Sequence, residues 1–569
     1  MTPTAGILAH LRRASRDPLW WVVGGLVLLY LALVVIRPQG IFWSLDEGGK
    51  FLYLQNVLRT HDPRAALDYP GRAIDPQLRF VPLYFWVRQG DQVYSWWAVG
   101  FSLLTLPFYL ALGWLGLYAL PILSGAVCAG LAGVLVRQTL ASVEGLAAPG
   151  WLAPAAALIT GLATPVAFYS TTFWEHTPSV ACFLASIACV LQGLRTRRAG
   201  WLVLAGLFAS ATTFLRTDSV LLVAGLLAAL LLWRWSSALV MGASFGAGSI
   251  PWMLLNWYWM GSPFSRYFSN ITDGPIFAGV REAGLAYVAY VLFNAPRVMA
   301  FELSPILLIL GTVATGVAIL AVAVPAGRWV SLLACVGLAA ISAYVLVQPY
   351  GYRSVHGFLL VAPQVVFAIW LYRSRPRGLP AFLALVVLAV SLAYGSAYLA
   401  RGWLAAGGLQ WGPRYLLALY PLTVVAALVG LAIHWSTFGR LFRAAVAATF
   451  IVGVVVGVGY EARGAYSLYE TVQSFAQARR SIDALPAGPL VTRCTWLDMV
   501  IPEVYWSRAI FAVNGQADFE AWSVEARQAG VHSGYMIDMD ACQNVGLDEV
   551  ARLTAANPSG LTSQRFDLP

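Results

Sequence analysis

The chain has 569 residues, of which 59% are hydrophobic and only 11% are charged. Soluble domains are typically about 45–50% apolar and about 25% charged, so the composition excludes an ordinary soluble domain. The net charge of +10 does not indicate a nucleic-acid partner, because the arginines stand in small groups between apolar blocks. These blocks are roughly 17–22 residues long, the length needed to cross about 30 Å of hydrocarbon. The composition therefore predicts an α-helical polytopic membrane protein.

Hydropathy predicts about thirteen membrane-spanning helices. Their approximate positions are 18–36, 118–136, 150–168, 177–193, 200–215, 217–233, 238–257, 301–322, 329–347, 357–372, 379–399, 414–434 and 443–460. Arg12, Arg13 and Arg16 precede the first span, but no small-residue cleavage site follows it. We therefore expect a retained span and not a removed signal peptide.

Residues 96–116 are also apolar enough to span a membrane. Counting them as a span would reverse the side of every later loop and place the arginine clusters outside. The Trp96-Trp97 pair and Pro107 suit helices at the membrane interface. We therefore predict interfacial or re-entrant helices here, within a long first outer loop at 37–117.

Alternate short loops hold arginines at high density, which predicts that these loops face the cytoplasm under the positive-inside rule. Their arginines are Arg137; Arg195, Arg197 and Arg198; Arg234; Arg328; Arg373, Arg375 and Arg377; and Arg440 and Arg443. This places the N-terminus in the cytoplasm and the last segment outside. We predict a transmembrane domain at 1–460 and a small extracytoplasmic α/β domain at 461–569. Strand-like runs at 490–492, 509–513 and 535–537 support the second domain.

Six cysteines give no spacing that resembles a metal site. Four lie within apolar blocks, where we expect small buried residues. Cys494 and Cys542 lie in the polar C-terminal segment. If that segment is outside the cytoplasm, these two could form a disulfide.

The most informative motif follows the first span and reads Ser44-Leu45-Asp46-Glu47-Gly48-Gly49-Lys50. Two adjacent carboxylates and the only lysine of the chain are unfavourable at a membrane boundary unless they have a function. We interpret Asp46 and Glu47 as the acidic centre of a catalytic site. The alternative is a solvated acidic loop, and a single lysine also fits the general arginine bias of the composition.

Two further outer loops carry ionisable residues. Trp174-Glu175-His176 lies between two spans, and we expect these side chains to take part in substrate binding or catalysis. The alternative is that Glu175 only caps the helix that follows. Arg216 and Asp218 join two apolar runs; they form a self-neutralising turn, or Arg216 faces the same cavity and binds a phosphate in bidentate fashion.

Two late outer loops complete the set of candidate binding residues. One carries Tyr352 and Arg353, and the other carries Arg414 and Tyr415 just before a predicted span. Arg414 is the cation that we expect deepest in the outer half of the bilayer, although it could simply extend to the lipid headgroups.

These motifs together resemble the GT-C class of integral-membrane glycosyltransferases, which includes protein O-mannosyltransferases and lipid A aminoarabinose transferases. The resemblance rests on the order of five short motifs over 1–434. They are Ser44 to Lys50, Trp174-Glu175-His176, Arg216-Thr217-Asp218, Asn256 with the Gly261-Ser262-Pro263 turn, and Gly412-Pro413-Arg414-Tyr415.

The resemblance implies a sugar donor carried on a polyprenyl phosphate, catalysis at the extracytoplasmic face and inversion at the anomeric carbon. It implies that Asp46 is the base or the orienting group for the acceptor. It also implies location in a bacterial inner (plasma) membrane. The oligosaccharyltransferase branch holds a divalent metal with acidic residues of the first two outer loops. This chain has Glu175-His176 where that branch carries an Asp-x-Glu pair, so a metal is not assured.

The expected partners are the donor, membrane lipid and a glycan, lipid or protein acceptor. We expect Asp46 as base, Glu47 or Glu175 as a second carboxylate, and Lys50, Arg216 and Arg414 near the phosphate. One alternative is a lipid or solute transporter, although transporters concentrate ionisable groups at the midplane, often with inverted repeats. Others are a lipid-linked polysaccharide polymerase or ligase and, less well supported, a non-catalytic assembly protein.

Overall fold

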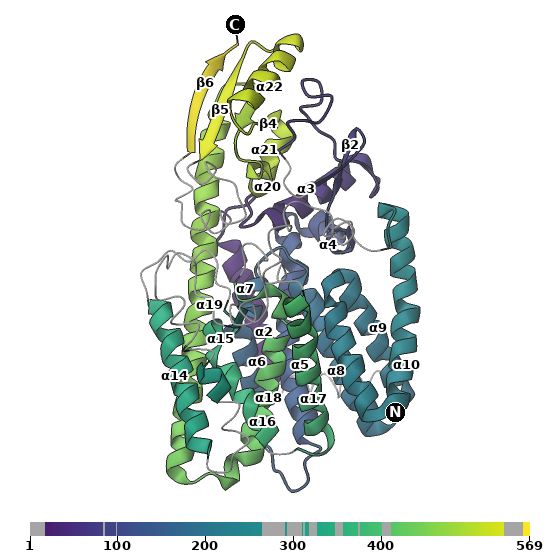
Figure 1. Ribbon diagram of the computed structural model, residues 1–569, viewed down its shortest axis with the longest axis vertical. Helices are drawn as coiled ribbons and strands as arrows, with labels where there is room; N and C mark the ends of the chain where they lie inside the picture. Colours follow the sequence, from purple (N-terminus) through teal and green to yellow (C-terminus); the bar gives the residue numbers. More distant parts are fainter. Residues whose placement is uncertain are drawn as a thin grey trace.

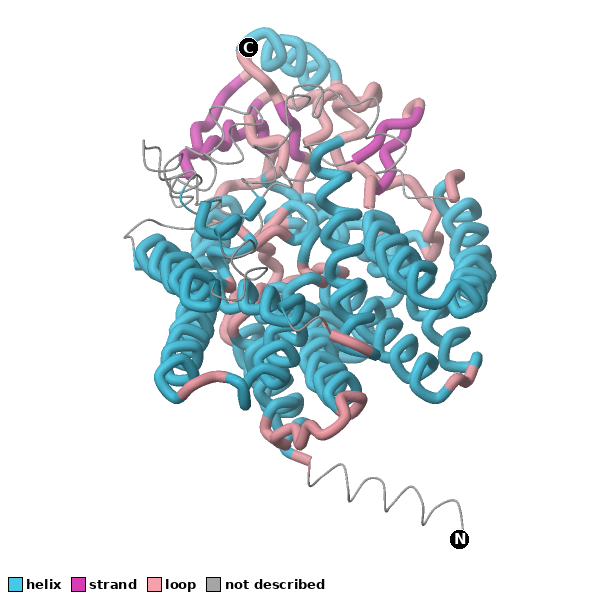
Figure 2. The backbone as a smooth tube through the Cα atoms, turned by 60° about the horizontal axis from the view of Figure 1, so that its bottom comes forward, coloured by secondary structure: helices cyan, strands magenta, loops and turns pink. Residues whose placement is uncertain are grey.

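A helical bundle with a small α/β unit at one end forms the molecule (Figure 1). The computed structural model describes residues 17–82, 86–97, 99–263, 327–347, 357–373, 376–400, 411–539 and 561–568, with a few positions between 291 and 317. In Figure 2 the helices fill the bundle, and the strands are confined to the end that holds the C-terminus. This arrangement confirms the predicted fold class, a polytopic α-helical protein with a small α/β unit near its C-terminus.

Among the described residues, ten helices of eleven or more residues build the bundle. They are α2 (Pro18–Val35), α5 (Trp114–Leu140), α6 (Leu152–Leu162), α8 (His176–Thr196), α9 (Ala199–Leu215), α10 (Val220–Met260), α14 (Arg328–Val347), α17 (Gly378–Ala400), α18 (Leu419–His434) and α19 (Arg440–Asp483). Short helices connect them: α7 (Val166–Tyr169), η1 (Thr217–Ser219), α15 (Phe358–Val361), η4 (Pro363–Ala368), α16 (Ile369–Arg373), η6 (Arg414–Leu416) and η7 (Trp435–Thr437).

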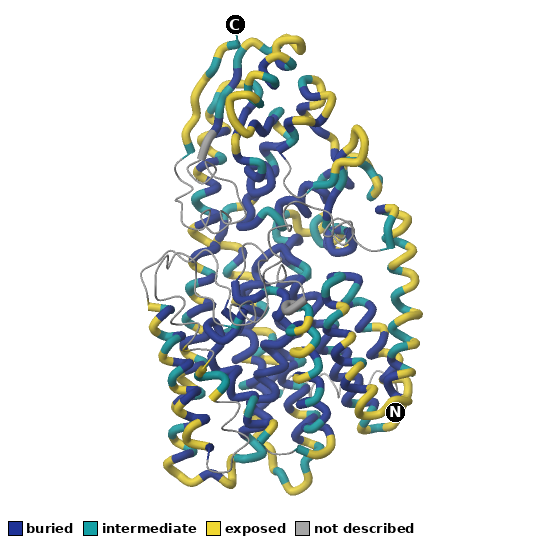
Figure 3. The backbone as a smooth tube through the Cα atoms, viewed as in Figure 1, coloured by how far each residue is buried: buried dark blue, intermediate teal, exposed yellow. Residues whose placement is uncertain are grey.

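Eight helices among the described residues are long and apolar enough to cross a membrane. Exposed leucines and valines cover the outside of the bundle, whereas its centre is buried (Figure 3). Apolar side chains directed outward in this number are typical of a lipid-facing surface. The chain is therefore a multi-pass membrane protein.

The predicted count of thirteen spans is not confirmed by the described residues, for identifiable reasons. The predicted span 150–168 is divided between α6 and α7, and the segment 357–372 is divided among α15, η4 and α16, where Pro363 begins the 3₁₀ helix. Most of the predicted span 301–322 lies outside the described residues. The spans 217–233 and 238–257 are the two legs of α10, which breaks at Arg234 (φ −157°, ψ 91°) so that Gly242 lies against Leu227.

The helix connections at the end of the bundle opposite the α/β unit (Figure 1) contain arginines and exposed tryptophans. The arginines of the connections there include Arg137, Arg197, Arg198, Arg234, Arg328, Arg373, Arg440 and Arg443. Exposed tryptophans at the same helix ends are Trp20, Trp21, Trp151, Trp201, Trp233, Trp235, Trp329 and Trp435. Aromatic belts of this kind mark a membrane–water interface.

The long connection between α2 and α5 contains the elements that position the site. They are α3 (Leu45–Thr60), the antiparallel hairpin of β1 (Trp86–Gln89) and β2 (Gln92–Ser95), and α4 (Val99–Leu112). At 14 residues, α4 is about 21 Å long, too short to cross the roughly 30 Å hydrocarbon core. Its length is consistent with the interfacial or re-entrant helix predicted for this segment.

The C-terminal unit is attached through α19, a helix of 44 residues. At about 66 Å, α19 extends beyond a membrane and passes without a break through the predicted boundary at 460. The unit contains β3 (Leu490–Thr492), α20 (Leu497–Val500), α21 (Pro502–Ser507), β4 (Ile510–Ala512), α22 (Gln516–Gln528), β5 (Ser533–Met539) and β6 (Leu561–Asp567).

Its sheet has the order β4-β3-β5-β6, with β6 antiparallel to β5 and the other pairs parallel. The three predicted strand runs correspond to β3, β4 and β5 and are confirmed. Cys494 is disulfide-bonded, while Cys542 lies outside the described residues.

The C-terminal unit packs directly on α3. The backbone N–H of Phe42 donates to the carbonyl of Val500 in α20 at 3.0 Å, and Trp506 Nε1 donates to Gln55 Oε1 of α3 at 2.6 Å. Helix α3 therefore lies between the membrane bundle and the C-terminal unit.

Candidate active site

The acidic motif forms the first turn of α3. Ser44 is the N-cap residue, and its hydroxyl accepts a hydrogen bond from the backbone N–H of Glu47, while the Glu47 carboxylate accepts from the N–H of Ser44. This reciprocal arrangement is a capping box, which the Ser-x-x-Glu spacing predicts. The motif is therefore helical and largely buried, and the alternative of a solvated loop is wrong.

Both oxygens of Glu47 bind backbone N–H groups. Oε2 accepts from Trp43 and Ser44 at 3.1 Å each, and Oε1 accepts from Phe173 in the next outer loop at 2.7 Å. Burial raises the pKa of the Glu47 carboxyl, although the Phe173 N–H and the charge of Arg37 partly offset this. Glu47 thus holds two loops together, and backbone donors occupy both of its oxygens.

The two glycines of the motif permit close contacts on both sides of α3. A Cβ at position 48 would lie 1.3 Å from the backbone carbonyl oxygen of Met499 in α20, and a Cβ at position 49 would lie 2.0 Å from the ring of Trp97. No real Cβ fits at such distances, so glycine is required at both positions. These contacts place α20 and Trp97 against the turn that carries Asp46.

Asp46 is held from two directions. Trp97 Nε1 donates to Oδ1 at 2.8 Å, and Arg414 Nη1 donates to Oδ2 at 2.8 Å. Burial alone would raise the pKa of the Asp46 carboxyl, but the charges of Arg414 and Lys50 and these two hydrogen bonds outweigh burial and lower it. Asp46 is therefore ionised at neutral pH, with its oxygens oriented by two fixed donors.

A second ion pair joins α3 to the Trp174-Glu175-His176 loop. Lys50 Nζ contacts Glu175 Oε2, with the lysine side chain only 3% exposed. Glu175 occupies the N-cap position of α8, but its side chain makes no capping hydrogen bond. The alternative role of Glu175 as a helix cap therefore does not account for its contacts.

Arg216 continues the same network. Its guanidinium binds Asp218 Oδ2 at 2.9 Å, lies 3.7 Å from Glu175 Oε1 and contacts the Nε2 atom of His176. Arg216 thus makes the local pair with Asp218 and also contacts Glu175 and His176, while phosphate binding by Arg216 stays a prediction.

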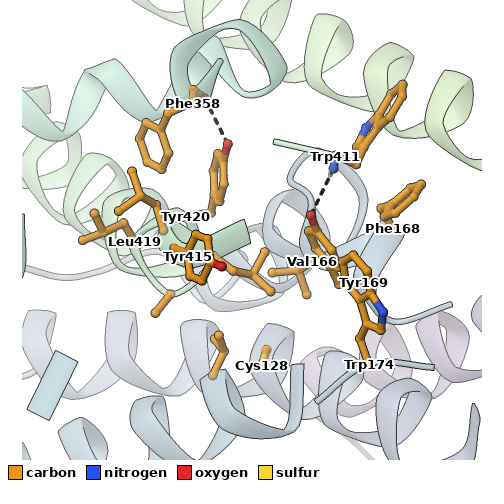
Figure 4. Close-up of a cluster of buried hydrophobic side chains, with 14 of the residues drawn as sticks. Cys128, Val166, Phe168, Tyr169, Trp174, Phe358, Trp411, Tyr415, Leu419 and Tyr420 are labelled. Carbon is orange, nitrogen blue, oxygen red and sulfur yellow. Dashed lines mark hydrogen bonds between the residues drawn. The ribbon is translucent and has the colours of Figure 1, made fainter. Parts of the chain in front are cut away.

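Aromatic rings line the cluster. The Arg414 guanidinium lies 5.1 Å from the ring centre of Trp174 and 5.3 Å from that of Tyr415, and Arg216 lies 5.4 Å from Tyr415. Trp174 stacks on Tyr169, whose hydroxyl accepts from the backbone N–H of Trp411 at 3.0 Å (Figure 4). These contacts fix the loop that carries Arg414 against the loop that carries Glu175.

A small pocket opens beside these groups. Its lining includes His176, Arg216, Asp218, Arg414 and Tyr415. All described candidate residues, from four separate segments of the chain, therefore lie in one connected cluster with this pocket.

Some motif residues have other positions. Tyr352 and Arg353 lie outside the described residues. Asn256 donates to the carbonyl of Pro263 at 3.4 Å and so closes the turn after α10. Trp97 was not a candidate from the sequence, because the Trp96-Trp97 pair was assigned to the membrane interface.

The arrangement of acids does not form a metal centre. Within the described part of the chain, no group of three or more His, Cys, Asp or Glu side chains could hold a metal ion. Asp46 in α3 and Glu175 before α8 bind the cations Arg414 and Lys50 instead. These acids are therefore paired with cations in the described residues, and the divalent metal that the resemblance raised stays a prediction.

No family model and no curated protein matches the sequence. Solved structures do match. The apo oligosaccharyltransferase of Archaeoglobus fulgidus is 13% identical, covers 95% of this chain and 71% of its own, and has a TM-score of 0.50. The archaeal oligosaccharyltransferase AglB from Archaeoglobus fulgidus, in complex with an inhibitory peptide and a dolichol-phosphate, is 12% identical over 92% and 69%, with a TM-score of 0.47. ArnT from Cupriavidus metallidurans, bound to undecaprenyl phosphate, is 13% identical over 91% and 92%, with a TM-score of 0.45.

The first of these likenesses shows the fold. This chain has the GT-C fold of integral-membrane glycosyltransferases, as the order of its motifs predicted.

Proposed function

We propose that this protein is an inverting glycosyltransferase that moves a sugar from a polyprenyl phosphate to a glycan, lipid or protein acceptor at the extracytoplasmic membrane face. One observation carries the proposal: the ionised Asp46 carboxylate contacts Arg414, which lines a pocket together with Arg216. The fold of an oligosaccharyltransferase supports the same class of reaction, although a fold alone does not define a function.

In the proposed reaction, proton transfer, bond formation and departure of the phosphate take place in a single step. An acceptor hydroxyl attacks C1 of the donor sugar while Asp46 accepts the hydroxyl proton, which requires the two oxygens to come within about 3 Å. The new C1–O bond forms as the bond from C1 to the phosphate oxygen breaks. The electron pair leaves with the polyprenyl phosphate, whose added negative charge is stabilised by Arg414 and Arg216.

The other acids have supporting roles in this proposal. Glu47 fixes the first turn of α3 through backbone N–H groups, which replaces its predicted role as a second catalytic carboxylate. Glu175 orients Lys50 and Arg216 beside the pocket. Trp174, His176, Asp218 and Tyr415 shape the phosphate side of the site.

The position of the charged cluster favours a transferase over a transporter. The cluster lies at the ends of α8, α9 and α18, on α3, and not in the middle of the spanning helices. A lipid-linked substrate requires this position, because its phosphate lies at the membrane surface while its chain stays in hydrocarbon. Transporters concentrate such residues at the midplane.

The proposed orientation can be tested with single cysteines. Arg64 follows α3 and Ser436 lies in η7 after α18; both are exposed, and the proposed topology places them on opposite sides of the membrane. In intact cells, an impermeant thiol reagent should label the Arg64→Cys variant, and should label the Ser436→Cys variant only after lysis. The reverse pattern would place the site in the cytoplasm and contradict the proposed donor assignment.

The proposed activity can be tested by donor class. Purified protein in detergent should release polyprenyl phosphate from one member of a panel of polyprenyl-phosphate sugars, in the presence of membrane extract as the acceptor source. Mass spectrometry should find the sugar on a product of that extract. Transfer from nucleotide sugars instead, or no transfer from any polyprenyl donor, would overturn the proposal.

A further inference from the structure

The charged cluster is already balanced. Its described members are three acids and three bases: Asp46, Glu175 and Asp218 with Lys50, Arg216 and Arg414. With His176 neutral, their formal charges sum to zero. An arriving phosphate therefore does not meet an excess of positive charge, and it must compete with a carboxylate for one of the cations.

The contacts indicate which cation exchanges its partner. Arg216 is close to two carboxylates, Asp218 at 2.9 Å and Glu175 at 3.7 Å, and it also contacts His176. Lys50 does not appear among the residues that line the pocket. Arg414 contacts the proposed base, Asp46, and its side chain also lines the pocket. It is therefore the cation through which a phosphate in the pocket can act on Asp46.

We propose that Arg414 exchanges Asp46 for the donor phosphate, so that Asp46 Oδ2 becomes accessible to the acceptor hydroxyl only after the donor has bound. This inference rests on the proposed function and adds an order of events to it. In the absence of donor, Arg414 occupies the oxygen that has to accept the proton. When the phosphate binds, Arg414 turns from Asp46 toward the pocket, while Trp97 keeps Asp46 oriented through Oδ1.

The exchange also explains how the site returns to its starting state. Bond cleavage leaves a phosphate with one more negative charge than the diester donor, so Arg414 is held more strongly by the product. When the polyprenyl phosphate leaves, Arg414 returns to Asp46, provided that the carboxylate has lost its proton. The two partners of Arg414 thus alternate through the catalytic cycle.

Equilibrium binding tests the exchange without any turnover. The probe is farnesyl phosphate, a short polyprenyl phosphate, titrated calorimetrically into the purified full chain in detergent; farnesol and inorganic phosphate are titrated separately. If Asp46 competes for Arg414, the Asp46→Asn variant should bind farnesyl phosphate about tenfold more tightly than the wild type. Arg414→Gln should bind it about tenfold or more weakly.

The double variant separates competition from general charge repulsion. In the Arg414→Gln background, Asp46→Asn should change the Kd by less than about twofold, because the shared partner is gone. An equal gain in both backgrounds would mean that Asp46 only repels the phosphate, and this result would overturn the exchange. The matched control is Asp62→Asn, which removes a carboxylate from the exposed Arg64–Asp62 pair and should leave the Kd unchanged.

Two further outcomes define the ligand and the independence of the test. Farnesol should bind more weakly than farnesyl phosphate, and inorganic phosphate should not reach its affinity; equal affinity for either would contradict a site for a lipid-borne phosphate. The coupling between Asp46 and Arg414 is measured without sugar transfer. A failed transfer assay with the coupling intact would therefore overturn the proposed function and not the exchange.

Discussion

Arg414 Nη1 donates a hydrogen bond to Asp46 Oδ2 at 2.8 Å, although 368 residues separate the two in the sequence. The pair joins the connection before α18 to the first turn of α3, and both side chains are mostly buried. A buried charge pair is stable only when both partners are held in good geometry. The site therefore exists only when the first outer loop and the late helices are packed together.

Trp97 should set the acidic limit of the proposed activity through its hydrogen bond to Asp46. The charges of Arg414 and Lys50 and the hydrogen bond from Trp97 hold the pKa of Asp46 below its usual value of 3.8, despite burial. Asp46 is then ionised above about pH 4, so wild-type transfer should show no loss from its protonation between pH 5 and 8. Trp97→Phe removes one stabilising bond to the carboxylate, raises the pKa of Asp46 and should move the acidic limb of the pH–rate profile to higher pH.

The control for this variant is Trp86→Phe. The Trp86 ring packs edge-on against the Trp97 ring, with ring centres 6.3 Å apart. The hydrogen bond to Asp46 comes from Trp97 and not from Trp86. Its pH–rate profile should match that of the wild type. An unchanged acidic limb in Trp97→Phe would contradict the role given to this hydrogen bond.

Gly48 should couple the C-terminal unit to the site. Gly48→Ala introduces a methyl group 1.3 Å from the carbonyl oxygen of Met499, so α3 or α20 has to move. Overpacking of this kind costs about 1–3 kcal/mol, and a shift of about 1 Å at a catalytic group can reduce turnover about 100-fold. We expect a lower thermal midpoint and a turnover reduced by about tenfold or more, measured by tryptophan fluorescence and by donor consumption.

The matched control is Gly24→Ala in α2, where an added Cβ meets nothing within 4 Å. It should retain the wild-type midpoint and rate. Equal behaviour of the two alanine variants would show that contact between α20 and α3 is not needed for activity.

The Lys50–Glu175 pair should contribute strongly to stability. Lys50→Met leaves the Glu175 carboxylate in a partly buried position without its nearest cation, and breaking a buried pair in this way costs about 3–5 kcal/mol. Arg64→Met provides the comparison, because the Arg64–Asp62 pair is exposed and is worth about 0–1 kcal/mol. Urea unfolding in detergent should separate the two variants clearly; similar midpoints would contradict the structural role of Lys50.

Much of the fold could be predicted, because the lengths of the apolar runs and the positions of the arginines indicate where the chain crosses the membrane. The break at Arg234 was indicated by the arginine between two apolar runs, and the strands of the C-terminal unit by their short apolar pattern. The continuation of α19 beyond 460 could not be predicted in the same way. Its polarity changes at that point, where the helix emerges from the hydrophobic bundle, but its helical geometry does not change.

The site was only partly accessible from the sequence. The order of the motifs indicated Asp46, Glu175, Arg216 and Arg414 as candidates, and the structure brings them together. The capping box at Ser44 could also be predicted from the Ser-x-x-Glu spacing. The contact between Gly48 and Met499 could not be predicted from the sequence. It involves a backbone carbonyl about 450 residues away, and no pattern of side chains indicates such a contact.

The central claim is that Asp46 accepts the proton of the acceptor hydroxyl during sugar transfer. The most direct measurement is the turnover of the Asp46→Asn variant with a polyprenyl-phosphate sugar, alongside the Asp62→Asn control. The account predicts that Asp46→Asn loses about 10²–10⁴-fold in rate while the protein stays folded in detergent, because the Asn side-chain oxygen can still accept a hydrogen bond from Arg414. Transfer at a rate close to that of the control would contradict it.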